Sequence, residues 1–138
     1  QSEADIKAFM RQPWVMTSSD GSEGHPRKYA SFAEKYAKYV KAEQTVSMGE
    51  FVHRSTGLSA DTFGLTGRGY LRPGYHADVV VLDPATYAPK ATYVQPELLS
   101  VGAEQVLVNG KFVVRDGQPT GALPGAGVLH APTADSCN

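Results

Sequence analysis

The N-terminal part of the chain alternates short apolar stretches with polar ones at changing intervals. In residues 2–10 the apolar side chains recur at helical spacing after a serine that favours an N-cap, which predicts a short helix. Pro13 would end this helix, and the apolar run at 14–19 (WVMTSS) predicts a short strand. A polar loop that contains glycine and proline is expected at 20–28.

Two longer helices are expected next. Residues 31–43 and 47–57 each begin with a serine followed three positions later by a glutamate, which is the spacing of a capping box. Apolar residues follow at helical intervals in both stretches, and Gly57 is a residue that can close the second helix. Residues 59–64 (SADTFG) predict one more helical turn that a glycine stops.

At about Thr66 the pattern becomes one of short β-rich runs. Residues 79–82 (VVVL) predict a strand, and residues 104–117 (EQVLVNGKFVVRDG) predict a hairpin, because Asn109-Gly110 favours a type I′ turn. From Gly117 the chain is rich in Gly, Pro and Ala and is expected to be irregular. One strand followed by helices is a single βα unit, and three or four later strands are few for a sandwich, so the order indicates the end of a larger fold.

Composition narrows the class of protein. The chain has 138 residues, of which 41% are hydrophobic and 20% charged, as in a globular domain. The formal net charge of −1 gives no electrostatic case for nucleic acid or for an anionic membrane surface, and no apolar run approaches the roughly 18 residues that span a bilayer. The single cysteine, Cys137, permits no internal disulfide, which favours the cytoplasm over the periplasm. A start at Gln1 leads us to expect a segment upstream.

Asp20 is the first candidate for chemistry. An Asp-Gly pair after a strand is a common turn, and this is the structural interpretation. The functional one depends on position, because an acid at the carboxyl end of a barrel strand faces the side where βα loops build active sites. The local sequence leaves both open.

His25 and Arg27 follow in the same loop. Arg27 is either a solvated side chain or a bidentate clamp for a substrate carboxylate. The other histidines form no HxH or HxxxH pair and are expected to be surface or packing residues: His53, His76 and His130. Ser18 and Ser19 lie in no G-x-S-x-G elbow. Local motifs alone therefore do not identify a complete catalytic site in this sequence.

Several stretches together carry a resemblance to a known family. They are PWVMTSSDG (13–21), HPRKYASF (25–32), RSTGLSADTFGL (54–65), RGYLRPGYHADVVVLDPATY (68–87), ATYVQPE (91–97) and VLVNGKFVVRDGQPTGALPG (106–125). The ADVVVLDP run is shared widely in the amidohydrolase superfamily. SSDG with HPR, followed by VLVNG and PTGALPG, resembles the C-terminal part of the N-acyl-D-amino-acid deacylases (D-aminoacylases) in particular.

The resemblance implies an α/β fold, the last βα unit of a (β/α)8 TIM barrel with C-terminal strands of a small β-sandwich. Residues 1–65 would end the metal-dependent hydrolase barrel, 66–125 would supply the sandwich strands, and 126–138 would be an irregular tail. Residues 14–19 would be the eighth barrel strand.

The same resemblance assigns the site. Asp20 corresponds to the aspartate after that strand, which is the general base towards the nucleophilic water and in many members also a metal ligand. Arg27 corresponds to the arginine that holds the α-carboxylate of the substrate, and His25 belongs to the same substrate-binding motif. The loop before HPR is shorter here than in better-known members. The other metal ligands of the family, including an N-terminal HxH, are absent from this sequence.

The leading hypothesis is therefore a C-terminal portion of a zinc-dependent hydrolase of N-acyl-D-amino acids, inactive without an upstream barrel segment. This chain alone is not expected to bind zinc tightly, because one carboxylate and scattered histidines cannot close a tetrahedral site. Its partners would be the substrate and the upstream segment, and copies of the fragment could associate with one another. The alternative is a non-catalytic β-rich module for binding or oligomerisation.

Overall fold

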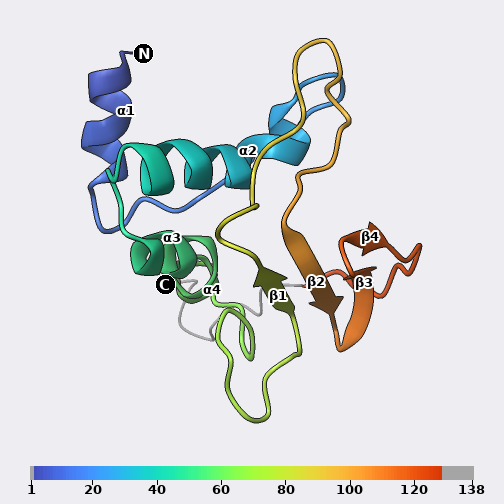
Figure 1. Cartoon of the computed structure of the whole chain (residues 1–138). Coiled ribbons are helices and arrows are strands. Elements are labelled where there is room, and N and C mark those ends of the chain that lie inside the picture. Colours follow the sequence, from blue (N-terminus) through green and yellow to red (C-terminus); the bar gives the residue numbers. More distant parts are fainter. Residues whose placement is uncertain (1, 129–138) are drawn as a thin grey trace.

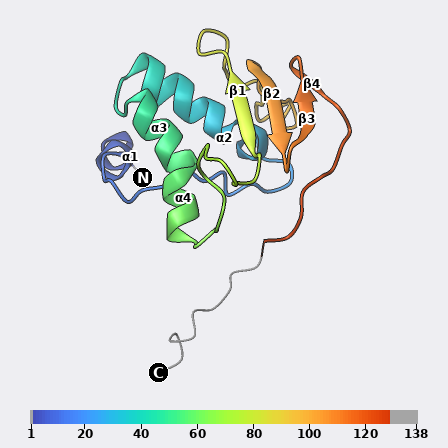
Figure 2. The same cartoon turned by 90° about the horizontal axis from the view of Figure 1, so that it is seen from below.

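A computed structural model describes residues 2–128 of the chain, with helices grouped on one side and an antiparallel sheet on the other (Figure 1). The same two groups remain side by side when the molecule is seen from below (Figure 2). The helices are α1 (Glu3–Met10), α2 (Arg27–Lys35), the π-helix η1 (Tyr36–Ala42), α3 (Met48–Ser55) and α4 (Gly57–Thr62). None of the described helices has the length and apolar composition that a bilayer crossing requires.

Helix α1 forms where the apolar spacing predicts it. Ser2 is the N-cap, and its hydroxyl accepts a hydrogen bond from the N–H of Asp5 while the Asp5 carboxylate accepts one from the N–H of Ser2. The helix contacts the middle of η1 through polar side chains, because Glu3 accepts hydrogen bonds from Lys38 and from the Tyr39 hydroxyl.

Helix α2 begins four residues earlier than the sequence pattern predicts. Pro26 takes the N-cap position, with a φ of −60° that already suits a helix, so Arg27 is the first helical residue. Ser31 therefore lies inside the helix, and its hydroxyl donates to the carbonyl of Arg27 at 2.8 Å. The predicted capping box between Ser31 and Glu34 is wrong, because a capping serine must precede the first turn.

The second predicted capping box is confirmed at α3. The Ser47 hydroxyl accepts from the N–H of Glu50, and the Glu50 carboxylate accepts from the N–H of Ser47. The sequence predicts that Gly57 closes this helix, and this prediction is wrong. Gly57 is instead the first residue of α4, because the chain turns at Thr56, where φ is −136° and ψ is −90°. Gly57 is buried against the Tyr70 ring, and a Cβ at this position would lie 2.6 Å from that ring.

Residues 14–19, predicted as a strand, form no strand in the structure. Two of their N–H groups donate to main-chain carbonyls, that of Val15 to Gln12 and that of Thr17 to Arg54. A strand exists only with a neighbour to pair with, and the four strands of the sheet pair only with one another. The backbone of 14–19 is thus left without a ladder.

The sheet contains the strands β1 (Val79–Leu82), β2 (Ala103–Val108), β3 (Lys111–Arg115) and β4 (Gln118–Pro119) in the order β1-β2-β3-β4, all antiparallel. The predicted type I′ turn is confirmed, since Asn109 and Gly110 have φ values of 49° and 77°. Asp78 supports it by accepting from the N–H of Asn109 at 2.8 Å, while Arg68 donates to Asp78 and to the Asn109 side chain.

The long connection between β1 and β2, residues 83–102, joins the sheet to the helices. The Tyr36 hydroxyl of η1 donates to the carbonyl of Pro84 at 2.8 Å, and the Tyr36 ring lies 5.4 Å from that of Tyr87. Further along, the Ser100 hydroxyl donates to the carbonyl of Tyr29 in α2.

The buried core lies between the helices and is small. Its apolar members are Ala30, Ala33, Tyr36, Tyr39, Val46, Phe51 and Ala60, and two cations, Lys35 and Arg54, are buried beside them. Several large apolar side chains remain exposed, including Phe9, Trp14, Leu71 and Val94.

Candidate functional site

Asp20 and Arg27, the two residues to which the sequence assigns chemistry, lie together in the structure. Asp20 stands at the end of 14–19 with a φ of 45°, a left-handed conformation that Asp tolerates better than most residues. Arg27, on the first turn of α2, brings Nη2 within 3.2 Å of Oδ2 of Asp20. The Asp20 side chain is 85% exposed and that of Arg27 40%, so the pair opens towards solvent.

The loop between them orients the guanidinium group. Nη2 of Arg27 also donates to the Ser22 hydroxyl at 3.3 Å, and the backbone N–H of Arg27 donates to Nδ1 of His25 at 3.1 Å. Nε of Arg27 is buried and has no hydrogen-bond partner among residues 2–128. Arg27 thus retains a spare donor beside its pairing with Asp20.

Tyr93 reaches this site from a distant part of the chain. The connection 83–102 runs beside the loop before α2 (Figure 1) and places the Tyr93 ring edge-on to His25 at a centroid distance of 5.2 Å. The Tyr93 hydroxyl lies 3.5 Å from Nε2 of His25. Local patterns could not identify Tyr93, because it is 68 positions from His25 and belongs to a loop without regular structure.

Residues 2–128 do not form a metal site by themselves. Within this range, no three His, Cys, Asp or Glu side chains gather closely enough to hold a metal ion. Asp20 could supply one oxygen ligand, whereas His53 and His76 are exposed elsewhere, on α3 and before β1. The remaining candidates, His130 and Cys137, lie outside the described residues. The donor set therefore fits at most one ligand of a zinc site.

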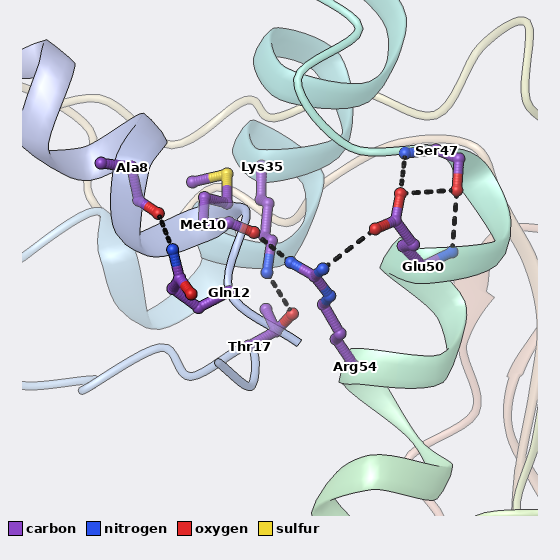
Figure 3. Close-up of polar contacts among 8 residues, drawn as sticks. All are labelled: Ala8, Met10, Gln12, Thr17, Lys35, Ser47, Glu50 and Arg54. Atoms are coloured by element: carbon purple, nitrogen blue, oxygen red, sulfur yellow. Dashed lines mark hydrogen bonds and ion pairs between the residues drawn. The ribbon is translucent and has the colours of Figure 1, made fainter. Parts of the chain in front are cut away.

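A second polar cluster, not anticipated from the sequence, lies between α1, α2 and α3 (Figure 3). Nζ of Lys35 donates to the Thr17 hydroxyl at 2.7 Å, and the Ser55 hydroxyl donates to the same oxygen at 2.9 Å. Burial, together with the charge of Arg54, lowers the pKa of Lys35 to about 8. A lysine in a helix is normally predicted to be exposed, so only the folded structure shows that Lys35 is buried.

Arg54 is buried as well but is paired with a carboxylate. Its guanidinium donates to the carbonyl of Met10 at the end of α1 and to Glu50 Oε1 at 3.0 Å (Figure 3). It thereby joins α1 to α3, and its charge is neutralised by Glu50. Lys35 has no such carboxylate among the ion pairs of the described residues.

Comparison with known proteins connects this arrangement to a family. Residues 3–114 match the profile of the Amidohydrolase family. The chain is 39% identical over 124 residues to N-acyl-D-aspartate deacylase of Alcaligenes xylosoxydans xylosoxydans, covering 87% of this chain and 25% of that protein. It is 36% identical over 127 residues to D-aminoacylase of the same organism, covering 89% and 26%. The chain thus spans about a quarter of the length of these curated relatives.

Solved structures agree. A crystal structure of D-aminoacylase superimposes with a TM-score of 0.83 at 36% identity, over 88% of this chain and 27% of that one. The N-acyl-D-glutamate deacylase of Bordetella bronchiseptica, in complex with zinc and a phosphonate that mimics the tetrahedral intermediate, superimposes with a TM-score of 0.78 at 40% identity, over 86% and 27%. The helices and the small antiparallel sheet therefore match a portion of the D-aminoacylase fold.

Proposed function

Because this chain belongs to the amidohydrolase family, we propose that it is the C-terminal portion of a metal-dependent N-acyl-D-amino-acid deacylase. The observation that carries the proposal is the similarity of almost the whole chain to enzymes of that name, with Asp20 and Arg27 adjacent on the exposed face before α2. Residues 1–65 would be the end of the barrel, and residues 66–125 would belong to the sandwich. Residues 14–19, which form no strand among residues 2–128, would become the eighth barrel strand by pairing with segments outside these 138 residues.

Asp20 acts as the general base in this proposal. Its carboxylate takes a proton from the water that adds to the amide carbonyl, and it delivers a proton to the amine nitrogen as the C–N bond breaks. Zinc, when bound, lowers the pKa of water and polarises the carbonyl, and its ligands other than Asp20 would come from the part of the relatives that this chain does not match. The products are a carboxylate and a free D-amino acid.

Arg27 binds the α-carboxylate of the substrate, with His25 fixing the backbone at the start of α2. A carboxylate at this position would compete with Asp20 for the guanidinium group. An exposed ion pair contributes only about 0.2–1 kcal/mol, so a substrate carboxylate can replace Asp20 at low energetic cost. Substrate binding would thus release Asp20 for proton transfer.

The direct test is an assay of the complete protein, reconstituted with zinc, on N-acetyl-D-amino acids and on their L-enantiomers. We expect release of free amino acid from the D-substrates, and none from the 138-residue chain alone. A complete protein that carries zinc and yet hydrolyses neither enantiomer would overturn the proposal and leave a non-catalytic module as the function.

A further inference from the structure

An open groove of about 430 Å³ lies between α1, residues 15–18 and α2, with Lys35 in its wall. Its other lining residues are mainly apolar and include Ile6, Phe9, Met10, Val15, Met16 and Tyr39. Phe9 is 63% exposed although it projects into this groove. Such a surface combines apolar area with a buried ammonium group.

The charge of Lys35 is not balanced within the described residues. Its side chain is 8% exposed and its polar contact is the neutral hydroxyl of Thr17. Glu34 also lines the groove from α2 but forms no ion pair with Lys35, and Glu50 on α3 is taken by Arg54. A buried ammonium group is costly unless a carboxylate pairs with it.

The backbone next to the groove also lacks a partner. Residues 14–19, of which 15–18 line the groove, have no strand neighbour, and of their N–H groups only those of Val15 and Thr17 donate to main-chain carbonyls among residues 2–128. Apolar side chains, a backbone without a strand neighbour and an unbalanced cation thus occur together in the lining of one groove. A polypeptide segment satisfies all three at once, whereas a small anion would satisfy the cation alone.

We propose that this groove is the docking site for a segment of the complete enzyme that lies outside these 138 residues, and that this segment supplies apolar side chains and one Asp or Glu carboxylate that pairs with Lys35. The inference rests on the proposed function, and the relatives contain enough chain for it, since about three-quarters of their length has no counterpart here. The carboxylate would bind Lys35 from the open side of the groove.

A charge-removing substitution tests the pairing by the sign of its effect. In the 138-residue chain, Lys35→Met removes an unbalanced buried charge, so the midpoint of thermal unfolding should rise. In the complete protein the same change strands a buried carboxylate, so the midpoint should fall by several degrees. Lys90→Met, at an exposed position in the connection 83–102, is the matched control and should shift neither midpoint.

The two results separate this inference from the proposed function. An effect of the same sign in both proteins would overturn the docking of a carboxylate on Lys35, whatever the deacylase assay gives. An inactive complete protein would overturn the function on which the inference rests. A 138-residue chain that forms a dimer, with Lys35→Met destabilising it, would also overturn the inference, because the occupant would then be a second copy.

A measurement on the unmodified side chain covers the case in which Lys35→Met does not fold. The NMR titration of the Lys35 side chain should give a pKa below the ordinary lysine value of 10.5 in the 138-residue chain and a pKa above that value in the complete protein. A pKa of Lys35 that stays low in the complete protein would contradict the pairing.

Discussion

Asp20 and Arg27 are held by one short loop, and each constrains the other. The left-handed backbone at Asp20 and the proline-initiated start of α2 bring the two side chains together over only seven positions. Their exposure allows both to exchange partners when a substrate arrives. The two predictions at this scale separate the roles that we propose for them.

Replacement of Asp20 by Asn in the complete enzyme should lower kcat by about 10²- to 10⁴-fold, because an amide cannot accept the proton from water. The KM for the substrate should change little. Steady-state kinetics and metal analysis of the same preparation check this. A variant that keeps most of its turnover at unchanged metal content would contradict the assignment of Asp20.

Replacement of Arg27 by Ala should mainly raise KM. Loss of a charge-assisted contact costs about 1.5–3 kcal/mol, which corresponds to a KM increase of about 10- to 150-fold for N-acyl-D-amino acids. Substrates whose carboxylate is amidated serve as the internal control and should be affected far less. Equal losses on both kinds of substrate would remove Arg27 from the carboxylate site.

Some residues of the two polar sites can be predicted from the sequence and others cannot. Asp20, His25 and Arg27 could be selected because they stand within a short motif, and the structure places them together. Their roles remain a proposal. Lys35 and Tyr93 could not be selected, because burial of the first and the contact of the second depend on elements that meet only in the folded chain.

Among the elements, α3 carries a capping box whose strength depends on ionisation. Hydrogen bonds from the N–H and the hydroxyl of Ser47 lower the pKa of Glu50 below its ordinary value of 4.5. The stabilisation is therefore complete above pH 4.5 and is lost as the pH falls through the lowered pKa. Glu50→Gln should flatten the decline of the unfolding midpoint at acid pH. Glu97→Gln, in an exposed stretch before β2, should leave the decline unchanged.

The hairpin between β2 and β3 depends on one glycine. Gly110 has a φ of 77°, and a Cβ there would make an ordinary contact of 3.9 Å with Ala77, so the backbone conformation alone opposes a side chain. Gly110→Ala should lower the free energy of unfolding by about 1–2 kcal/mol. Gly125→Ala is the control, because that position has open space and no positive φ. Equal denaturation midpoints for the two variants would contradict this account.

Local signals predicted these elements well where a short motif determines them. Ser47 with Glu50 and Asn109-Gly110 contain their own partners within a few residues, and both are confirmed. The predicted start of α2 at Ser31 is wrong. Pro26 and Ser31 both favour a helix start, and the helix begins after Pro26, which comes first in the chain. The prediction of a strand at 14–19 is wrong for residues 2–128, because an apolar run does not determine which other strand it will pair with.

For the whole molecule, we expect uneven stability. Residues 106–114 pair within their own hairpin, whereas 14–19 have no ladder. Amide hydrogen exchange of the 138-residue chain should be slow in the first range and fast in the second. In the complete protein both ranges should be protected, since missing segments would pair with 14–19. Equal protection of the two ranges in a proven monomer of this chain would contradict the fragment interpretation.

The length of the connection 83–102 between β1 and β2 also has a consequence during translation. A hairpin such as β2–β3 closes in about 1–10 μs once both strands exist, whereas β1 has no partner until β2 has been synthesised. At roughly 5–20 residues per second, the interval from Leu82 to Val108 lasts about 1–5 s. Through that time the valines of β1 stand unpaired on the nascent chain, so β1 is one stretch that a ribosome-associated chaperone should bind until β2 has emerged.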